Sequence, residues 1–218
     1  MNDLWGPLFL SSGIALAATA LTALLGVPLA FALSRRHFRG KSLLEAMLTL
    51  PLVLPPTVVG YMLIITFGAR GWVGMWLERW FGYSILFRFE GAVLASAVVA
   101  FPLLYMPAKA AFASVAREFE DTAKVMGASS LQLFWNVSLP MAKRGILSGV
   151  TLAFARALGE FGATVMVFGW APGRLTLPIS VYSDYEQGDL GHATGAVVAL
   201  TALSLALIAS YNRSTSGK

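Results

Sequence analysis

The sequence predicts an all-α polytopic membrane protein with about five transmembrane helices, and three observations support this prediction. Of the 218 residues, 57% are hydrophobic and 12% are charged, whereas soluble domains average about 25% charged residues. Five apolar stretches approach or exceed the roughly 20 residues that a spanning helix needs. Basic residues gather on alternate connections between these stretches, as the positive-inside rule requires.

The five predicted spans form one transmembrane domain over 1–218. They cover about residues 8–34, 43–67, 91–113, 145–168 and 192–211. The first apolar run is longer than the core of a signal peptide, and no basic residue precedes it. We therefore expect it to be a retained helix rather than a cleaved signal.

Basic residues also set the predicted orientation. Eleven of the sixteen Lys and Arg residues lie in 35–41, in the connection between the third and fourth spans, and in the tail with Arg213 and Lys218. With five spans, these three segments lie on the same side of the membrane. The positive-inside rule then places the N-terminus outside and the C-terminus inside. The net charge of +5 is therefore a topology signal rather than a sign of nucleic-acid binding.

The two outer segments differ in character. Trp72, Trp76 and Trp80 recur every four residues in the segment 71–89, which predicts an amphipathic helix at the membrane–water interface. A docking surface for an outside partner is the alternative. The segment 170–191 contains Pro178 and other turn-forming residues, which favours an ordered loop.

The second predicted span contains three prolines, Pro51, Pro55 and Pro56, followed by Thr57. Proline lacks a backbone N–H and clashes with the carbonyl four residues before it, so this helix should kink or break. A broken helix at membrane depth is tolerated inside protein or beside a water-filled cavity. A second half that begins near Pro56 would offer its N-terminus to an anionic substrate. A proline kink that serves packing alone is the other interpretation.

Arg156 and Glu160 lie four residues apart in the fourth predicted span. Each charge costs about 2.5–3.5 kcal/mol at the centre of a membrane helix, so both side chains should face protein or water. On one continuous helix they share a small, polar face, which comprises Gly149, Ala153, Arg156, Ala157, Glu160, Ala163 and Thr164. Two interpretations stay open: an ion pair that locks the bundle, and a transport pathway or gate. Proton transfer by Glu160, or enzyme chemistry by the pair, is a further alternative.

A polar insert, 118–140, interrupts the apolar chain on the predicted cytoplasmic side. Acids in the first turn favour a helix over 118–126, and Gly127 fits the position that follows a helix end. Ser129 and Gln132 match a capping box that would start another helix. The insert is therefore predicted to be two short helices joined by a tight turn.

The second helix of the insert is predicted over 130–137, with Pro140 as its stop. The pair imitates a DNA-binding helix-turn-helix. The second helix presents Phe134 and Trp135 but no Lys or Arg, so it lacks the usual contacts to phosphates and bases. We expect no nucleic-acid partner.

Other motifs exclude several chemistries. Residues 40–42 read Gly-Lys-Ser, but the first glycine of a phosphate-binding loop is replaced by Arg35. The chain has no cysteine, and its two histidines, His37 and His192, are far apart, which argues against a metal centre. We therefore expect no catalytic residue, bound metal or cofactor in this chain.

The insert resembles the EAA loop of ABC-importer permeases, whose pattern is EAA, three residues, Gly, nine residues, an aliphatic residue, one residue and Leu-Pro. The matching positions are Asp121, Thr122, Ala123, Gly127, Val137, Leu139 and Pro140. The first two depart conservatively from Glu-Ala. The resemblance implies that these residues, with the adjacent Glu120 and Ala128, couple the chain to a cytoplasmic ATPase.

Two further segments, 50–61 and 155–164, resemble the molybdate-type (ModB-type) permeases, which are related to the sulfate permeases. This resemblance implies a type I ABC importer fold in the bacterial cytoplasmic (inner) membrane. It also implies a homodimer with two ATPase copies that bind ATP–Mg, and a periplasmic oxyanion-binding protein. The residues that would line or gate the pathway are Pro51, Pro55, Pro56, Thr57, Arg156, Gly159, Glu160, Gly162 and Thr164. The implied substrate is molybdate, or tungstate; the alternatives are sulfate or thiosulfate, and a proton-coupled anion carrier that uses Glu160.

Overall fold

The computed structural model describes residues 4–170 and 174–216, and those residues contain helices and connections but no strand. Lys218 of the predicted cytoplasmic tail lies outside them. The helices before the insert are α1 (Trp5–Arg35), α2 (Lys41–Thr49), η1 (Leu50–Leu52), α3 (Pro56–Phe67), α4 (Trp72–Phe81) and α5 (Phe89–Ser114). The helices from the insert onward are α6 (Arg117–Val125), α7 (Ser130–Leu133), η2 (Phe134–Ser138), α8 (Leu139–Leu158), α9 (Gly162–Phe168), α10 (Leu177–Glu186) and α11 (Leu190–Ser216).

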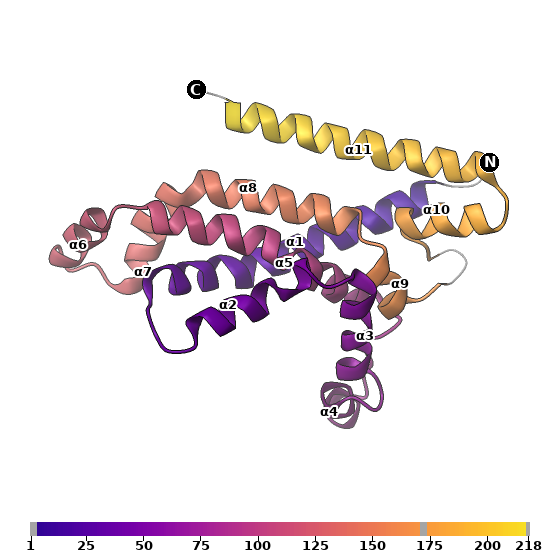
Figure 1. The fold of residues 1–218 in the computed structure, drawn as a ribbon, viewed down its shortest axis with the longest axis horizontal. Helices are drawn as coiled ribbons and strands as arrows, with labels where there is room; N and C mark the ends of the chain where they lie inside the picture. The colour runs from indigo at the N-terminus through magenta and orange to yellow at the C-terminus, as the bar shows by residue number, and fades with distance from the viewer. Residues whose placement is uncertain (1–3, 171–173, 217–218) are drawn as a thin grey trace.

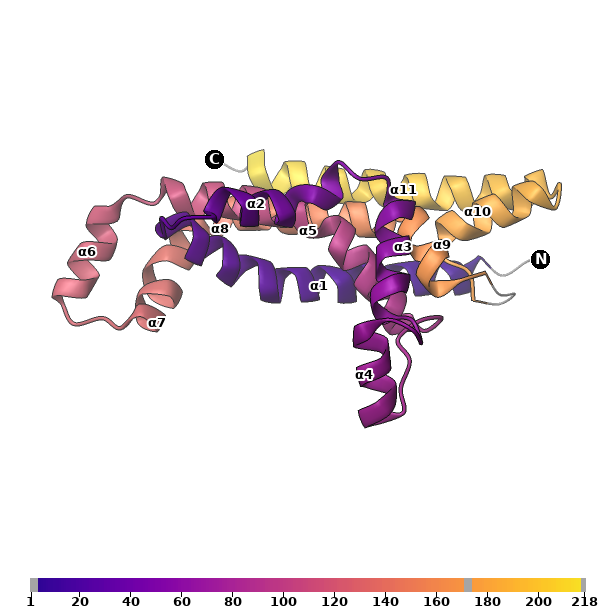
Figure 2. The same cartoon turned by 60° about the horizontal axis from the view of Figure 1, so that its bottom comes forward.

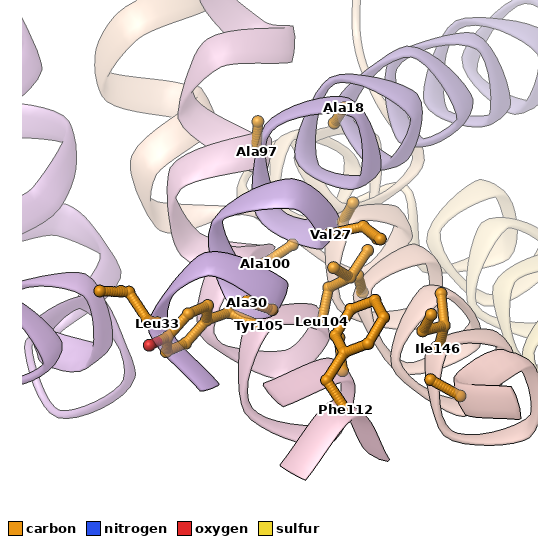
Figure 3. Packing of buried hydrophobic residues seen from close by; sticks show 14 of the residues in the cluster. Ala18, Val27, Ala30, Leu33, Ala97, Ala100, Leu104, Tyr105, Phe112 and Ile146 are labelled. Carbon is orange, nitrogen blue, oxygen red and sulfur yellow. The ribbon is translucent and has the colours of Figure 1, made fainter. Parts of the chain in front are cut away.

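Three long helices, α1, α5 and α8, lie side by side and form the core (Figures 1 and 2). Small residues at their contacts allow the backbones to approach closely, which is how helices associate in membranes. A Cβ atom added at Gly149 of α8 would lie 2.9 Å from the Leu104 carbonyl oxygen of α5. Figure 3 shows Ala18, Ala30 and Ala100 at this core, where each is fully buried. The α8 part of the small face predicted for the fourth span therefore packs against α5 at Gly149.

The last helix, α11, lies along the outside of α8 (Figure 1). Only 11% of its most apolar window is buried within the chain. A hydrogen bond of 2.7 Å joins the Ser148 and Tyr211 hydroxyls and ties α11 to α8. At its other end α11 packs on α10.

The five predicted spans correspond in position to the helices of the structure. By length and composition, α1, α5 and α11 are each able to cross a membrane. Two bent pairs pass the same test when each pair is taken together: 41–52 with 56–67, and 130–158 with 162–168. Counting each bent pair as one span gives five.

The fourth span is not the single helix that the sequence predicts. It breaks after Leu158, and α9 continues at an angle of 59°. The prediction failed because Gly159 ends α8 and the Glu160 carboxylate starts α9 by accepting the Ala163 N–H at 2.7 Å. A helical wheel that runs through this break therefore misplaces the residues beyond Leu158.

Two smaller predictions about loops are also wrong. Pro140 does not stop the second helix of the insert, because a π-helical turn, η2, leads directly into α8 with Pro140 in its first turn. The segment 170–191 is not a loop throughout, because it contains the helix α10 with Pro178 in its first turn.

The structure confirms the helix predicted around the tryptophans, which is α4. Trp72, Trp76 and Trp80 are all exposed on it. In Figure 2, α3 and α4 run across the direction of the long helices, and α4 stands away from the core. This placement is compatible with both predicted roles, an interfacial anchor and a docking surface.

Candidate functional site

The second span is broken at its prolines, as the sequence predicts. Pro51 lies in η1, and Pro55, with a ψ of 135°, takes the chain out of helical geometry. A new helix, α3, begins at Pro56. The two halves are bent by 113°, because each proline removes a donor and blocks the preceding turn.

The second halves of both broken spans, α3 and α9, lie against each other. A Cβ atom added at Gly60 of α3 would be 2.8 Å from the Met166 Cβ of α9. At the start of α9, a Cβ atom added at Gly162 would be 3.2 Å from the Thr57 backbone nitrogen and 3.1 Å from the Pro56 Cβ. Glycine at positions 60 and 162 is therefore what allows the two half-helices to touch.

Arg156 and Glu160 form an ion pair across the break between α8 and α9, which is one of the two interpretations that the sequence leaves open. The Arg156 Nη2 and Glu160 Oε2 atoms are 2.5 Å apart, and the side chains are 30% and 1% exposed. The other oxygen of Glu160 accepts the Ala163 N–H. Glu160 is thus neutralised by Arg156 and caps α9 at the same time, which offsets the cost of burying its charge.

A small polar cavity lies beside Glu160. Its volume is about 10 Å³. Ser11 from α1, Ser96 from α5, Thr164 from α9 and Thr176 before α10 contribute hydroxyls to its wall. Ser11 accepts the first N–H of α10 at 2.7 Å, and the Ser96 and Thr164 hydroxyls are 3.4 Å apart. These hydrogen bonds join α1 to α10 and α5 to α9 beside the break, inside the protein rather than on an open surface.

The predicted pathway residues separate by exposure. Those exposed are Pro55, Thr57 and Gly159; those partly buried are Pro51, Pro56 and Arg156; those buried are Glu160, Gly162 and Thr164. All nine lie at or beside the two breaks. Pro51 lines a separate apolar pocket of about 250 Å³ with α1 and α5. A groove of about 600 Å³ between α10 and α11 is lined by none of the nine.

The first helix of the insert, α6, ends in a Schellman motif. Gly127 has a φ of +86°, the left-handed conformation that glycine adopts without strain. The Ala128 N–H donates to the Ala123 carbonyl at 2.9 Å, and the Gly127 N–H donates to the Lys124 carbonyl at 2.9 Å. These are the two bonds that define the motif. The helix end predicted at Gly127 is therefore confirmed.

The predicted capping box is present at the start of α7. The Ser129 hydroxyl accepts the Gln132 N–H at 3.3 Å, and the Gln132 side chain accepts the Ser129 N–H at 2.8 Å. The turn between α6 and α7 is therefore defined by hydrogen bonds at both of its ends.

The outer surface of the insert carries exposed apolar side chains. Val125 is 89% exposed, Met126 83% and Leu131 68%. Figure 2 shows α6 and α7 at one end of the long helices, away from α4 and α9. These three apolar residues are not among the predicted coupling residues. Of the predicted ones, Asp121, Thr122, Gly127 and Pro140 are exposed, and Ala123, Ala128, Val137 and Leu139 are partly buried. Apolar patches of this kind on an otherwise polar segment mark protein interaction sites.

Glu120 departs from the other predicted coupling residues because it is buried, with 4% of its surface exposed. Its Oε1 atom is 2.5 Å from the Arg35 Nη2 atom and accepts the Ser138 hydroxyl at 2.9 Å. Arg35 and Ser138 are absent from the predicted site. From the sequence Arg35 counts only as a topology signal, and no local pattern links it to an acid 85 positions away.

No metal centre appears in residues 4–170 and 174–216, where no three His, Asp or Glu side chains are grouped to hold an ion.

Comparison with known proteins identifies the family. A family model described as the binding-protein-dependent transport system inner membrane component matches residues 8–215. The molybdenum transport system permease protein ModB of Haemophilus influenzae is 39% identical over 200 residues, 91% of this chain and 87% of the relative. ModB of Escherichia coli K12 is 39% identical over 205 residues, which are 94% of this chain and 89% of the relative. The sulfate transport system permease protein CysW of Synechocystis is 36% identical over 88% of this chain and 72% of the relative.

Solved structures confirm the predicted type I importer permease fold. A chain of the inward-facing MetNI methionine ABC transporter gives a TM-score of 0.69 at 17% identity, over 95% of this chain and 92% of that one. A chain of a bacterial alginate ABC transporter was solved in complex with a periplasmic protein that binds an alginate pentasaccharide. It gives a TM-score of 0.67 at 17% identity, over 95% of this chain and 77% of that one. Together with the match over residues 8–215, these findings show that the chain belongs to the family of inner membrane components of binding-protein-dependent transport systems.

Proposed function

We propose that this chain is the membrane-spanning subunit of an ATP-driven importer for molybdate, with tungstate as a chemically similar second substrate. Two molybdenum transport permeases are 39% identical to it over about nine-tenths of its length. A sulfate permease is 36% identical over 88% of the chain, which makes sulfate or thiosulfate the second candidate. Molybdate and sulfate are both tetrahedral oxyanions, so the same pathway chemistry would serve either substrate.

The observation that carries the ATP-driven part of the proposal is the insert α6–α7. It lies at one end of the bundle and exposes Val125, Met126 and Leu131, while its turn is held by hydrogen bonds at both ends. A rigid helix with an exposed apolar tip suits docking into a groove of another protein. In this proposal that protein is a cytoplasmic ATPase, which binds ATP–Mg, and the permease chain itself catalyses nothing.

The pathway in this proposal runs beside the two broken spans. Half-helices at membrane depth recur at substrate sites of transporters, and α3 and α9 meet through Gly60 and Gly162. Arg156, which is 30% exposed, is the charged side chain of the pair with access to an anion, whereas Glu160 is 1% exposed. We assign Glu160 to holding the bend and Arg156 to the edge of the pathway.

The complete transporter in this proposal is a homodimer of this chain with two ATPase copies and a periplasmic oxyanion-binding protein, in the bacterial cytoplasmic membrane. ATP binding drives transport only if it stabilises one access state over the other. The insert supplies a contact whose position differs between those states.

Uptake into reconstituted vesicles tests the proposal. The chain is purified with the ATPase and binding protein encoded in the same genome, and labelled molybdate, tungstate and sulfate are supplied with and without ATP inside. We expect uptake that requires ATP and both partners, with molybdate competing better than sulfate. Preferred sulfate uptake would replace the substrate assignment. Uptake driven by a proton gradient without the ATPase would overturn the proposed function and favour a carrier that uses Glu160.

A further inference from the structure

Glu120 holds the insert to the rest of the chain. Of the nine residues of α6, it is the only one that is buried. Its Oε1 atom meets Arg35 Nη2 at 2.5 Å and accepts the Ser138 hydroxyl at 2.9 Å. The same Arg35 nitrogen donates to the Val115 carbonyl at 3.3 Å. We call Arg35, Glu120 and Ser138 the Glu120 anchor.

The Glu120 anchor joins parts of the chain that are distant in sequence. Arg35 is the last residue of α1, Val115 is in the connection from α5, and Ser138 is the last residue of the π-helical turn before α8. The Glu120 carboxylate therefore links α6 to the end of α1 and the start of α8, and Arg35 adds a link to the connection after α5. A displacement of α6 would reach α1 and α8 through these bonds.

Polar bonds rather than apolar packing fix α6 in place. A hollow of about 480 Å³ lies between α6, α7 and the end of α1, and Arg35 and Glu120 form part of its wall. The apolar side chains Phe119 and Val125 of α6 are exposed. Since α6 has no apolar face against the core, loss of the Glu120 anchor would leave it attached mainly through its ends.

Burial makes the anchor strong and rigid. The Glu120 side chain is 6% exposed and the Arg35 side chain 17%, so water screens their attraction poorly. Removing one partner leaves the other charge without compensation. The Lys124–Asp121 pair on the outer surface of α6 is 60% and 66% exposed, and pairs of that kind contribute little.

We propose that Glu120 is a positioning residue that makes α6 move as one body with the cytoplasmic ends of α1 and α8. The proposal rests on the proposed coupling to an ATPase and assigns Glu120 a different role from its neighbours. Asp121, Thr122 and the apolar tip face outward to the partner, whereas Glu120 passes the partner's movement inward. Through α8 that movement reaches the break at Glu160 and the contact between α9 and α3.

The coupling ratio, ATP hydrolysed per molybdate imported, is the measurement that isolates this role. The variants are Glu120→Gln and Arg35→Gln in the complete reconstituted transporter. We expect the ATPase to co-purify as before and to hydrolyse ATP, while uptake falls roughly tenfold, as expected for loss of a hydrogen bond to a buried charge. Ser138→Ala removes one neutral donor and should raise the ratio less.

Two comparisons make the test specific. The double variant Arg35→Gln/Glu120→Gln should cost no more than either single variant, because the two residues act through each other. Glu45→Gln is the matched control: it breaks a similar pair, Lys109 Nζ to Glu45 Oε1 at 2.6 Å, that does not involve α6. We expect Glu45→Gln to leave the coupling ratio unchanged.

Three results would overturn the proposal: an unchanged coupling ratio in Glu120→Gln, additive effects in the double variant, or loss of ATPase co-purification in Glu120→Gln. The last result would place Glu120 in docking or in folding of α6 instead. Failure of the proposed function is distinguishable, because wild-type chain would then import molybdate without ATP or not at all.

Discussion

Two arginine–glutamate pairs, one at each functional region, show how the same chemistry serves different purposes. Arg35–Glu120 and Arg156–Glu160 both bring a guanidinium nitrogen within 2.5 Å of a carboxylate oxygen. In both pairs the acid is almost fully buried and the arginine is partly exposed. The first joins residues 85 positions apart; the second joins residues four positions apart, across a helix break.

The difference lies in what each acid holds besides its arginine. Glu160 caps the helix that follows it, so its pair stabilises a local bend and, through it, the fold. Glu120 accepts from the Ser138 hydroxyl just before α8, so its pair connects the insert to the core helices. We therefore expect the break pair to govern stability and the Glu120 anchor to govern coupling.

The largest expected effect tests the stability role of the break pair. Glu160→Ala removes both the partner of Arg156 and the cap of α9. We expect a loss of about 3 kcal/mol, the lower end for breaking a buried pair because Arg156 is 30% exposed. The measurement is the melting temperature and membrane yield of the purified chain.

A graded comparison sharpens that result. Glu160→Gln keeps an oxygen for the Ala163 N–H but leaves Arg156 unpaired, so it should impair stability or uptake less than Glu160→Ala. Arg156→Gln/Glu160→Gln removes both charges and should recover part of the stability. Wild-type melting and uptake in Glu160→Gln would show that the pair does not hold the bend.

The second effect tests the contact between α3 and α9. Gly60→Val would place its Cβ 2.8 Å from the Met166 Cβ and 3.0 Å from the Ala163 backbone, which overpacks the contact at a cost of about 1–3 kcal/mol. We expect a lower melting temperature and reduced uptake. Gly13→Val is the matched control in α1, where the nearest atom, Phe89 Cε2, is 3.8 Å away. Equal losses in both variants would count against a special contact at Gly60.

The third effect concerns the insert and leaves the break untouched. Gly127→Val forces a branched residue into φ +86° at a cost of about 1–2 kcal/mol, so the turn should distort and ATPase association should weaken by about tenfold. Membrane insertion should be normal. Gly127→Asn is the control, because asparagine tolerates this conformation. If both variants bind the ATPase as wild type does, the turn has no part in coupling.

The smallest effect concerns the capping box. Ser129→Ala removes the acceptor for the Gln132 N–H and should destabilise the start of α7 by about 1 kcal/mol. Hydrogen exchange should become faster in 130–133, while exchange in α8 stays unchanged. Ser130→Ala, one position on, leaves the box intact and should not change exchange. Equal protection in both variants would mean that tertiary contacts alone define α7.

Features that depend on neighbouring residues were predictable from the sequence. The break at Pro51–Pro56, the turn at Gly127 and the capping box of Ser129 follow from backbone chemistry that each residue carries with it. The positions of the apolar spans follow from length and composition. The side on which each end of the chain lies stays a prediction.

Features that depend on distant contacts were not predictable. Gly159 alone is tolerated inside a helix; it ends α8 here because Glu160 caps α9 and Gly162 meets Pro56 and Thr57. From the sequence alone, Pro140 predicts the end of a helix. The π-helical turn that carries the chain through it into α8 is visible only in the structure. The inward direction of Glu120 depends on Arg35 from another helix, and no local spacing encodes that pairing.

The π-helical turn of η2 has a consequence at the level of the gene. In it the Leu139 N–H donates to the Phe134 carbonyl five positions back, so the turn contains one residue more than an α-helical path would. Loss of a single codon within 134–138 would let α7 run into α8 as one regular helix. The insert would then rotate by about 100° relative to α8, and Ser138 would no longer face Glu120. Gain or loss of one codon here is thus a route by which descendants of this gene would re-aim the insert without altering any transmembrane side chain.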